Sequence, residues 1–157
     1  MKSVIAVHSY HHGNTRKIAD AIGGELAAEV MTVAEMAKIE TAAYDLIGFG
    51  AGIDSGRHYE PMLEFAEAMP QATGQKVFIF STAGIAGKEK KKLSDHNALR
   101  DILCGKGYET LGEFACKGFN TNSFLKYLGG MNKGRPNADD ISAASGFARE
   151  LKGRVSR

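Results

Sequence analysis

The sequence predicts an α/β protein whose open parallel β-sheet is covered by helices on both faces. Strand-like and helix-like segments alternate along all 157 residues, with no repeat, low-complexity tract or linker between them. The run at 44–50 is almost continuously apolar, as expected for a strand that is covered on both faces. Strands that alternate with helices imply right-handed parallel crossovers, which place helices on both sides of the sheet.

Five strands are expected, at residues 3–7, 30–33, 44–50, 76–81 and 109–116. Helices are expected at 16–26, 61–69, 93–106 and 138–152, with a short helical turn at 34–37. Pro61 is tolerated in the first turn of its helix, whereas Pro70 stops that helix. Gly107 ends the helix before the last strand. The stretch 117–137 has no clear element, and a short helix at 123–128 or a functional loop explains its length.

Length and composition indicate a single domain over residues 1–157. The chain is 43% hydrophobic and 24% charged, which is ordinary globular composition. No apolar run approaches the roughly 18–20 residues of a membrane span, and the N-terminus does not resemble a signal peptide. We therefore expect a cytoplasmic protein without a membrane partner. The formal net charge of +2 is too small to imply nucleic-acid binding.

Cys104 and Cys116 stand twelve positions apart, which matches neither a redox CxxC motif nor a zinc site. We interpret both as small buried hydrophobic residues. Two basic regions have two open interpretations, either solvated surface or a landing site for an acidic redox partner or for the phosphates of a pyridine nucleotide. They consist of Lys88, Lys90, Lys91 and Lys92, and of Lys126, Lys133 and Arg135.

The loop at 9–15 joins the first strand to the first helix and is rich in hydroxyl groups. A helix N-terminus presents unpaired backbone N–H groups and a partial positive charge, so a phosphate fits there. Gly13 permits positive φ, and Asn14 or Thr15 can cap the helix. An ordinary capped turn between a strand and a helix is the alternative at this point.

Three loops follow the carboxyl ends of strands, at 9–15, 50–59 and 81–87. In open parallel sheets, ligands bind beyond these ends, where the strand order reverses. The second loop carries three glycines, which let a flat ring approach the backbone, and the third is again small and hydroxyl-bearing. Together the loops indicate a ligand site at this edge of the sheet.

The three loops, in this order and at these separations, resemble the flavodoxin family over nearly the whole chain. The segments 112–121 and 129–137 are similar to a subgroup of single-domain flavodoxin-like proteins. The resemblance implies a three-layer α/β/α fold, a five-stranded parallel sheet of order 2-1-3-4-5 and non-covalent binding of FMN. By position, the phosphate lies on the loop at 9–15 and the isoalloxazine lies between 51–53 and 82–84. The implied cofactor-binding residues are Ser9, Tyr10, His11, His12, Gly13, Asn14, Thr15, Gly50, Ala51, Gly52, Ile53, Asp54, Ser81, Thr82, Ala83 and Gly84.

The chain departs from the family pattern in two places. Tyr10, His11 and His12 occupy the middle of the phosphate loop, where the family usually alternates Ser or Thr with Gly. The chain has no tryptophan, and Asp54 stands where the family usually has an aromatic residue. His58 or Tyr59 is the candidate substitute, although Tyr59 is equally suited to packing at the start of the next helix.

The function that the resemblance implies is electron transfer by bound FMN between a reductase and an acceptor protein, without a catalytic residue or a metal. The protein is expected to be a monomer or a homodimer. An NAD(P)H-dependent FMN or quinone reductase is the first alternative, in which Arg57 and the lysines at 88–92 contact nucleotide phosphates. A flavin-free binding module of the same fold is the second.

Overall fold

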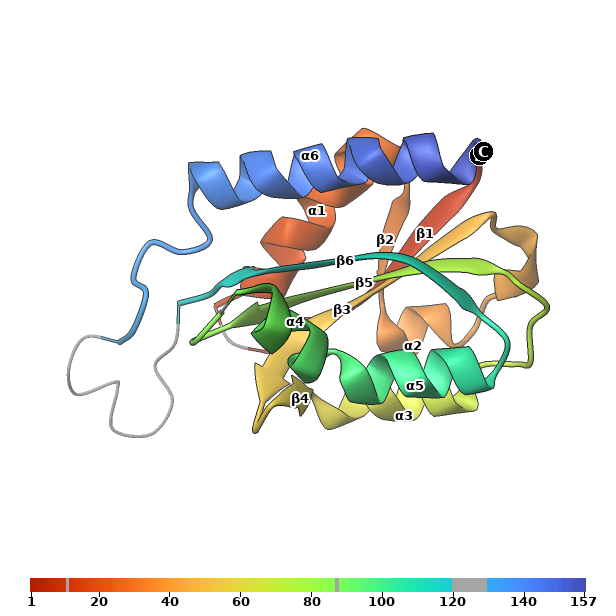
Figure 1. Cartoon of the computed structure of the whole chain (residues 1–157), viewed down its shortest axis with the longest axis horizontal. Helices are drawn as coiled ribbons and strands as arrows, with labels where there is room; N and C mark the ends of the chain where they lie inside the picture. Colours follow the sequence, from red (N-terminus) through yellow and green to blue (C-terminus); the bar gives the residue numbers. More distant parts are fainter. Residues whose placement is uncertain (11, 87, 120–129) are drawn as a thin grey trace.

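The computed structural model describes residues 1–10, 12–86, 88–119 and 130–157, and these form three layers (Figure 1). Helices α1 (Asn14–Leu26) and α6 (Ala138–Val155) cover one face of the central sheet. Helices α2 (Val33–Met36), α3 (Glu60–Ala68) and α5 (Asn97–Gly105) cover the other face. The sheet therefore has a helical layer on each side, as predicted.

Five strands of the sheet are parallel and follow the order β2-β1-β3-β5-β6. This is the order that the family resemblance implies, counted over the parallel strands alone. A sixth strand, β4, pairs antiparallel with the end of β3 and lies off this path. The strands are β1 (Ser3–His8), β2 (Glu29–Thr32), β3 (Leu46–Asp54), β4 (Arg57–His58), β5 (Lys76–Ala83) and β6 (Glu109–Lys117).

The helix expected at 93–106 is two helices instead of one. Helix α4 (Glu89–Asp95) ends at His96, and α5 begins at the next residue. The His96 side chain is fully buried and hydrogen-bonded to two strands, which turns the chain inward at this position. A short 3-10 helix, η1 (Thr41–Ala43), precedes β3. The proposed short helix at 123–128 lies outside the described residues.

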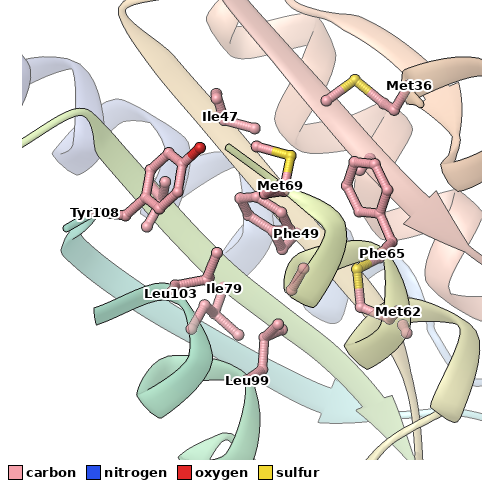
Figure 2. Packing of buried hydrophobic residues seen from close by; sticks show 14 of the residues in the cluster. Met36, Ile47, Phe49, Met62, Phe65, Met69, Ile79, Leu99, Leu103 and Tyr108 are labelled. Carbon is pink, nitrogen blue, oxygen red and sulfur yellow. The ribbon is translucent and has the colours of Figure 1, made fainter. Parts of the chain in front are cut away.

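Two apolar cores fill the spaces between the layers. On the face of α3 and α5, Phe49 and Ile79 of the sheet meet side chains from the helices, including Met62 and Leu99 (Figure 2). On the opposite face, the Phe80 ring lies over Gly50 of β3, where a Cβ would lie 2.0 Å from the ring. This glycine is therefore explained by packing between neighbouring strands.

The last helix begins as its sequence predicts. Asn137 accepts from the backbone N–H of Asp140, and the Asp140 carboxylate accepts from that of Asn137.

Cys116 is buried, but Cys104 is exposed, so the prediction for Cys104 is wrong. It follows Leu103, which points into the core, and one helical step turns the next side chain outward. Among the described residues, no helix is long and apolar enough to cross a membrane.

Candidate functional site

A cleft lies at the carboxyl ends of β1, β3, β5 and β6, between the backbone turns that follow these strands. Strands β1 and β3 are neighbours from which the chain runs toward opposite edges of the sheet, so this is the point where the strand order reverses. The cleft is lined by Tyr10, Asn14, Thr15, Gly52, Ile53, Tyr59, Thr82, Ala83, Gly84, Gly118 and Phe119.

In the turn between β1 and α1 the N-cap residue is Gly13, which has no side chain to cap the helix, and the Arg16 N–H in the first turn donates to Ser9 Oγ at 3.4 Å. His12 and Gly13 have φ values of 54° and 63°, and Gly13 is the N-cap residue. The expectation that Asn14 or Thr15 caps the helix is wrong, because both side chains reach across to other elements. Asn14 Nδ2 donates to the Phe119 carbonyl at 2.8 Å, and the Thr15 hydroxyl lies 2.8 Å from that of Thr82.

The glycine-rich segment at 50–59 is not an open loop: its first part continues β3 to Asp54, and a β-hairpin follows. Ser55 and Gly56 form its tip with φ values of 51° and 78°, the positive pair that suits a two-residue hairpin. Their two flanking residues pair across the hairpin, Asp54 with Arg57. The hairpin thus folds back beside the end of β3.

Tyr59 follows the hairpin and forms one side of the cleft. Its backbone N–H donates to the Gly52 carbonyl at 3.0 Å, and a Cβ at Gly52 would lie 2.4 Å from its ring. The ring also contacts His8 and Tyr10 edge-on, at centroid distances of 6.0 and 6.2 Å. Gly52 therefore lacks a side chain because the Tyr59 ring occupies that space.

The hairpin is anchored below the cleft by His58, which is 1% exposed. Its Nε2 lies 3.1 Å from the Phe80 carbonyl and must donate to it, because a carbonyl oxygen only accepts. Burial, together with a smaller contribution from the neighbouring His96, lowers the pKa of His58 to about 3. His58 is therefore a neutral side chain that ties β4 to β5.

The chain after β6 forms another wall of the cleft. The Gly118 N–H donates to the Ala83 carbonyl at 3.0 Å, continuing the contact between β5 and β6. Asn132 Nδ2 donates to the carbonyls of Gly84 and Gly118, at 2.6 and 3.3 Å. The Phe119 ring lies against the His12 ring, with centroids 4.3 Å apart. The wall is thus bonded both to β5 and to the turn before α1.

The family model of the flavodoxin domain matches residues 5–139. The chain belongs to the flavodoxin family. This flavodoxin-family chain is 44% identical over 151 residues to an uncharacterized protein of Methanocaldococcus jannaschii, with 96% of the chain and 98% of that protein covered.

Solved flavodoxins share the fold of this family member. Oxidised flavodoxin 2 from Bacillus cereus superposes with a TM-score of 0.71 at 20% identity, covering 98% of this chain and 99% of that one. A flavodoxin from the domain Archaea superposes with a TM-score of 0.68 at 15% identity, covering all of both chains. At these identities the likeness concerns the fold, and the site is argued from the residues of this chain.

Half of the predicted cofactor-binding residues line the cleft. They are Tyr10, Asn14, Thr15, Gly52, Ile53, Thr82, Ala83 and Gly84. Ser9, His12 and Gly13 belong to the adjoining turn, and Ser9 Oγ accepts from the Arg16 N–H at 3.4 Å. Gly50, Ala51 and Ser81 are buried in the sheet, and Asp54 is exposed on the hairpin. His11 lies outside the described residues.

Three further residues line the cleft beyond that predicted set: Tyr59, Gly118 and Phe119. Tyr59 was weighed as an aromatic substitute, and the structure places it both at the cleft and at the start of α3. Gly118 and Phe119 fall in the segment that resembles the flavodoxin-like subgroup. Their signal was the position directly after the last strand, which ends at the same edge as the other loops.

Proposed function

We propose that this protein binds FMN without a covalent bond in the cleft and carries electrons between redox partner proteins. The observation that carries the proposal is the start of α1, capped by a glycine without a side chain, beside a cleft that backbone turns and aromatic rings line. Family membership supports a flavin-type ligand, and the residues of the cleft suit each part of FMN.

The turn at 9–15 suits the phosphate. His12 and Gly13 have successive positive φ values, which turn the backbone just before the helix, and backbone turns of this kind can present N–H groups to an anion. The open N–H groups at the start of α1 add donors and partial positive charge. The hydroxyl of Ser9 lies near the same helix start, bonded to the Arg16 N–H.

Asn14 supplies a second sign of fit. Its Oδ1 is buried and has no hydrogen-bond partner among the described residues, while its Nδ2 is held by Phe119. A buried acceptor without a donor costs about 1–3 kcal/mol. The ribityl hydroxyls of FMN are donors of the kind that this oxygen needs.

The rest of the cleft suits a flat aromatic ring. Gly52 and Ile53 from the end of β3 line it, with Thr82, Ala83 and Gly84 from the end of β5 and the turn after it. Tyr59 and Phe119 provide aromatic surface where the chain lacks tryptophan. Bound FMN supplies the redox chemistry, and the protein positions the ring, offers backbone hydrogen bonds and excludes water.

An electron carrier is favoured over an NAD(P)H-dependent reductase because the basic side chains near the cleft already have acidic partners. Arg57 pairs with Glu60, Lys91 with Asp95, and Lys92 with Glu89 at 2.8 Å. Lys88 and Lys90 are exposed and suit an acidic redox partner.

The visible absorption spectrum tests the cofactor. The purified protein is mixed with FMN or riboflavin, passed through a desalting column and scanned. We expect FMN to be retained with perturbed bands and to bind at least tenfold more tightly than riboflavin, because riboflavin lacks the phosphate. Equal retention of both would contradict the phosphate site, and retention of neither, with no fluorescence change on titration, would overturn the proposal. Bleaching of bound FMN by NADH or NADPH alone would replace the carrier with the reductase.

A further inference from the structure

A chain of buried polar side chains runs beneath the cleft, on the side of α4 and α5. The Ser81 hydroxyl lies 2.7 Å from His96 Nε2, and His96 Nδ1 lies 2.9 Å from Glu113 Oε2. Arg100 closes the chain, with Nε 2.6 Å from Glu113 Oε1. Ser81 and His96 are 1% and 0% exposed. None of these side chains is among those that line the cleft.

The acidic end of this chain is ionised. Burial alone would raise the pKa of Glu113, but hydrogen bonds from His96 and Arg100 outweigh it and lower the pKa to about 2. The hydrogen bond to Glu113 raises the pKa of Arg100. When the His96 ring is neutral, the negative charge of Glu113 and the positive charge of Arg100 cancel. A proton added to His96 would therefore give the group a net charge of one positive unit.

The two buried histidines differ in their ability to hold that proton. Their ring centroids are 4.8 Å apart. His58 donates from Nε2 to a carbonyl, and its Nδ1 faces no partner among the described residues, so an added proton there would have no acceptor. His96 has a carboxylate at Nδ1 and a hydroxyl at Nε2. A hydroxyl both donates and accepts, so it satisfies the neutral and the protonated ring equally.

The chain is joined to the cleft through two backbone links. Ser81 directly precedes Thr82, which lines the cleft. His58, whose ring contacts His96, pairs across the hairpin with Ile53, which also lines the cleft. A charge that develops on a ligand in the cleft therefore lies next to the elements that hold His96.

We propose that His96 takes up one proton from solvent when the bound flavin takes up one electron from its reductase protein. This inference rests on the proposed function. The proton forms a bond to His96 Nε2, and the Ser81 hydroxyl turns from donor to acceptor. The negative charge on the flavin is then balanced by an imidazolium ion that Glu113 already faces. Electron and proton arrive together, so the total charge of the site is unchanged.

The other titratable groups around His96 keep their charge, so the proton on His96 is the net change in the charge of the protein at this site. His58 of β4 stays neutral, Glu113 of β6 pairs with Arg100 of α5, and on α4 Lys91 pairs with Asp95. Lys92, also on α4, pairs with Glu89 and donates to the Glu113 carbonyl at 3.1 Å. Linkage is reciprocal, so a proton on His96 must favour the reduced flavin as much as reduction favours the proton.

Two measurements on the FMN-loaded protein test the proposal. The first follows the His96 ring by NMR during pH titrations of the oxidised and the fully reduced protein. We expect the ring to take up its proton at least one pH unit higher in the reduced protein. The second compares midpoint potentials from pH 5 to 9 with those of His96→Gln and Glu113→Gln. Flavin itself takes up protons, so the potential depends on pH in every variant. The readout is therefore the difference in midpoint potential between each variant and the wild type at each pH. The control is Glu109→Gln, the same change at the exposed far end of β6.

The wild-type potential should exceed that of His96→Gln at low pH, and the difference should close as the pH rises. A shift of one pH unit in proton uptake is a tenfold change in equilibrium, about 59 mV for one electron. The potential of Glu113→Gln should also rise less than that of wild type as the pH falls. Glu109→Gln should follow the wild-type curve. The NMR titration decides alone if the variants fail to fold. Retained FMN with the same His96 titration in both redox states would overturn this inference only, whereas failure to bind FMN would overturn the proposed function with it.

Discussion

The hydroxyl groups of Thr15 and Thr82 lie 2.8 Å apart and join the first turn of α1 to the end of β5. The two residues are 2% and 5% exposed, so water does not replace a lost partner. This contact fixes the distance between the turn that suits the phosphate and the wall that suits the ring.

We expect Thr15→Val and Thr82→Val each to lower the free energy of unfolding by about 1–3 kcal/mol, because each leaves one buried hydroxyl unpaired. The double variant should cost clearly less than the sum, since it leaves no unpaired hydroxyl at this contact. Urea denaturation of the FMN-free protein measures all four forms. Additive losses would show that the two hydroxyls do not interact.

Gly52→Ala tests the contact with Tyr59. Its Cβ would lie 2.4 Å from the ring, so Tyr59 must move out of its place beside the cleft. We expect a loss of about 1–3 kcal/mol in stability from overpacking, and weaker binding of FMN, followed by fluorescence titration.

Gly24→Ala is the matched control, because a Cβ at this exposed position of α1 meets nothing within 4 Å. It should raise stability by roughly 0.5–1 kcal/mol through helix propensity and leave FMN affinity unchanged. Unchanged FMN affinity in Gly52→Ala as well would mean that Tyr59 does not shape the cofactor site.

The parallel sheet could be predicted because its signals are local. The strand β5 is apolar over most of its length, and backbone hydrogen bonding forces such runs to pair. The hairpin at Ser55 and Gly56 was harder, because β4 has only two residues and the glycines before it also suit a ligand loop. The local sequence pattern does not distinguish a short hairpin from a ligand-binding loop.

The walls of the cleft depend on contacts between distant residues. Asn14 meets Phe119, 105 positions away, and Asn132 meets Gly84, 48 positions away. Nothing in the neighbourhood of Asn14 distinguishes a helix cap from a tertiary contact. The break at His96 has the same origin, because its partners Ser81 and Glu113 come from two other strands.

Asp54→Asn should raise the midpoint potential of the bound flavin. Asp54 lies on the exposed hairpin beside the cleft, and its negative charge disfavours added negative charge on the ligand. A unit charge about 10 Å away across water contributes roughly 0.4 kcal/mol, or about 20 mV for one electron.

The shift should shrink in high salt, because exposed charges are screened. Potentiometry at low and high ionic strength measures it, with Glu109→Gln at the far end of the sheet as the control. No rise at low salt would show that the Asp54 carboxylate does not act on the flavin.

Stability should fall as the pH drops below about 6.5, because His58 stays neutral in the folded protein. Its pKa is lowered from 6.5 to about 3 in the folded state, mainly by burial. Between these values the unfolded chain binds a proton at His58 that the folded protein does not. Each pH unit in this window therefore removes up to about 1.4 kcal/mol of stability. The contribution of Glu113 has the same sign but a lower window, since its pKa is lowered from 4.5 to about 2.

His58→Gln separates the two windows. The amide can still donate to the Phe80 carbonyl, but it does not titrate. Urea denaturation at pH 7.5, 6.5, 5.5 and 5.0 should give a shallower decline for this variant than for the wild type, even if it is less stable at pH 7.5. His12→Gln, in the turn before α1, is the control for removing a histidine. Parallel curves for wild type and His58→Gln would mean that His58 gains a proton in the folded state, and that the hairpin opens to admit it.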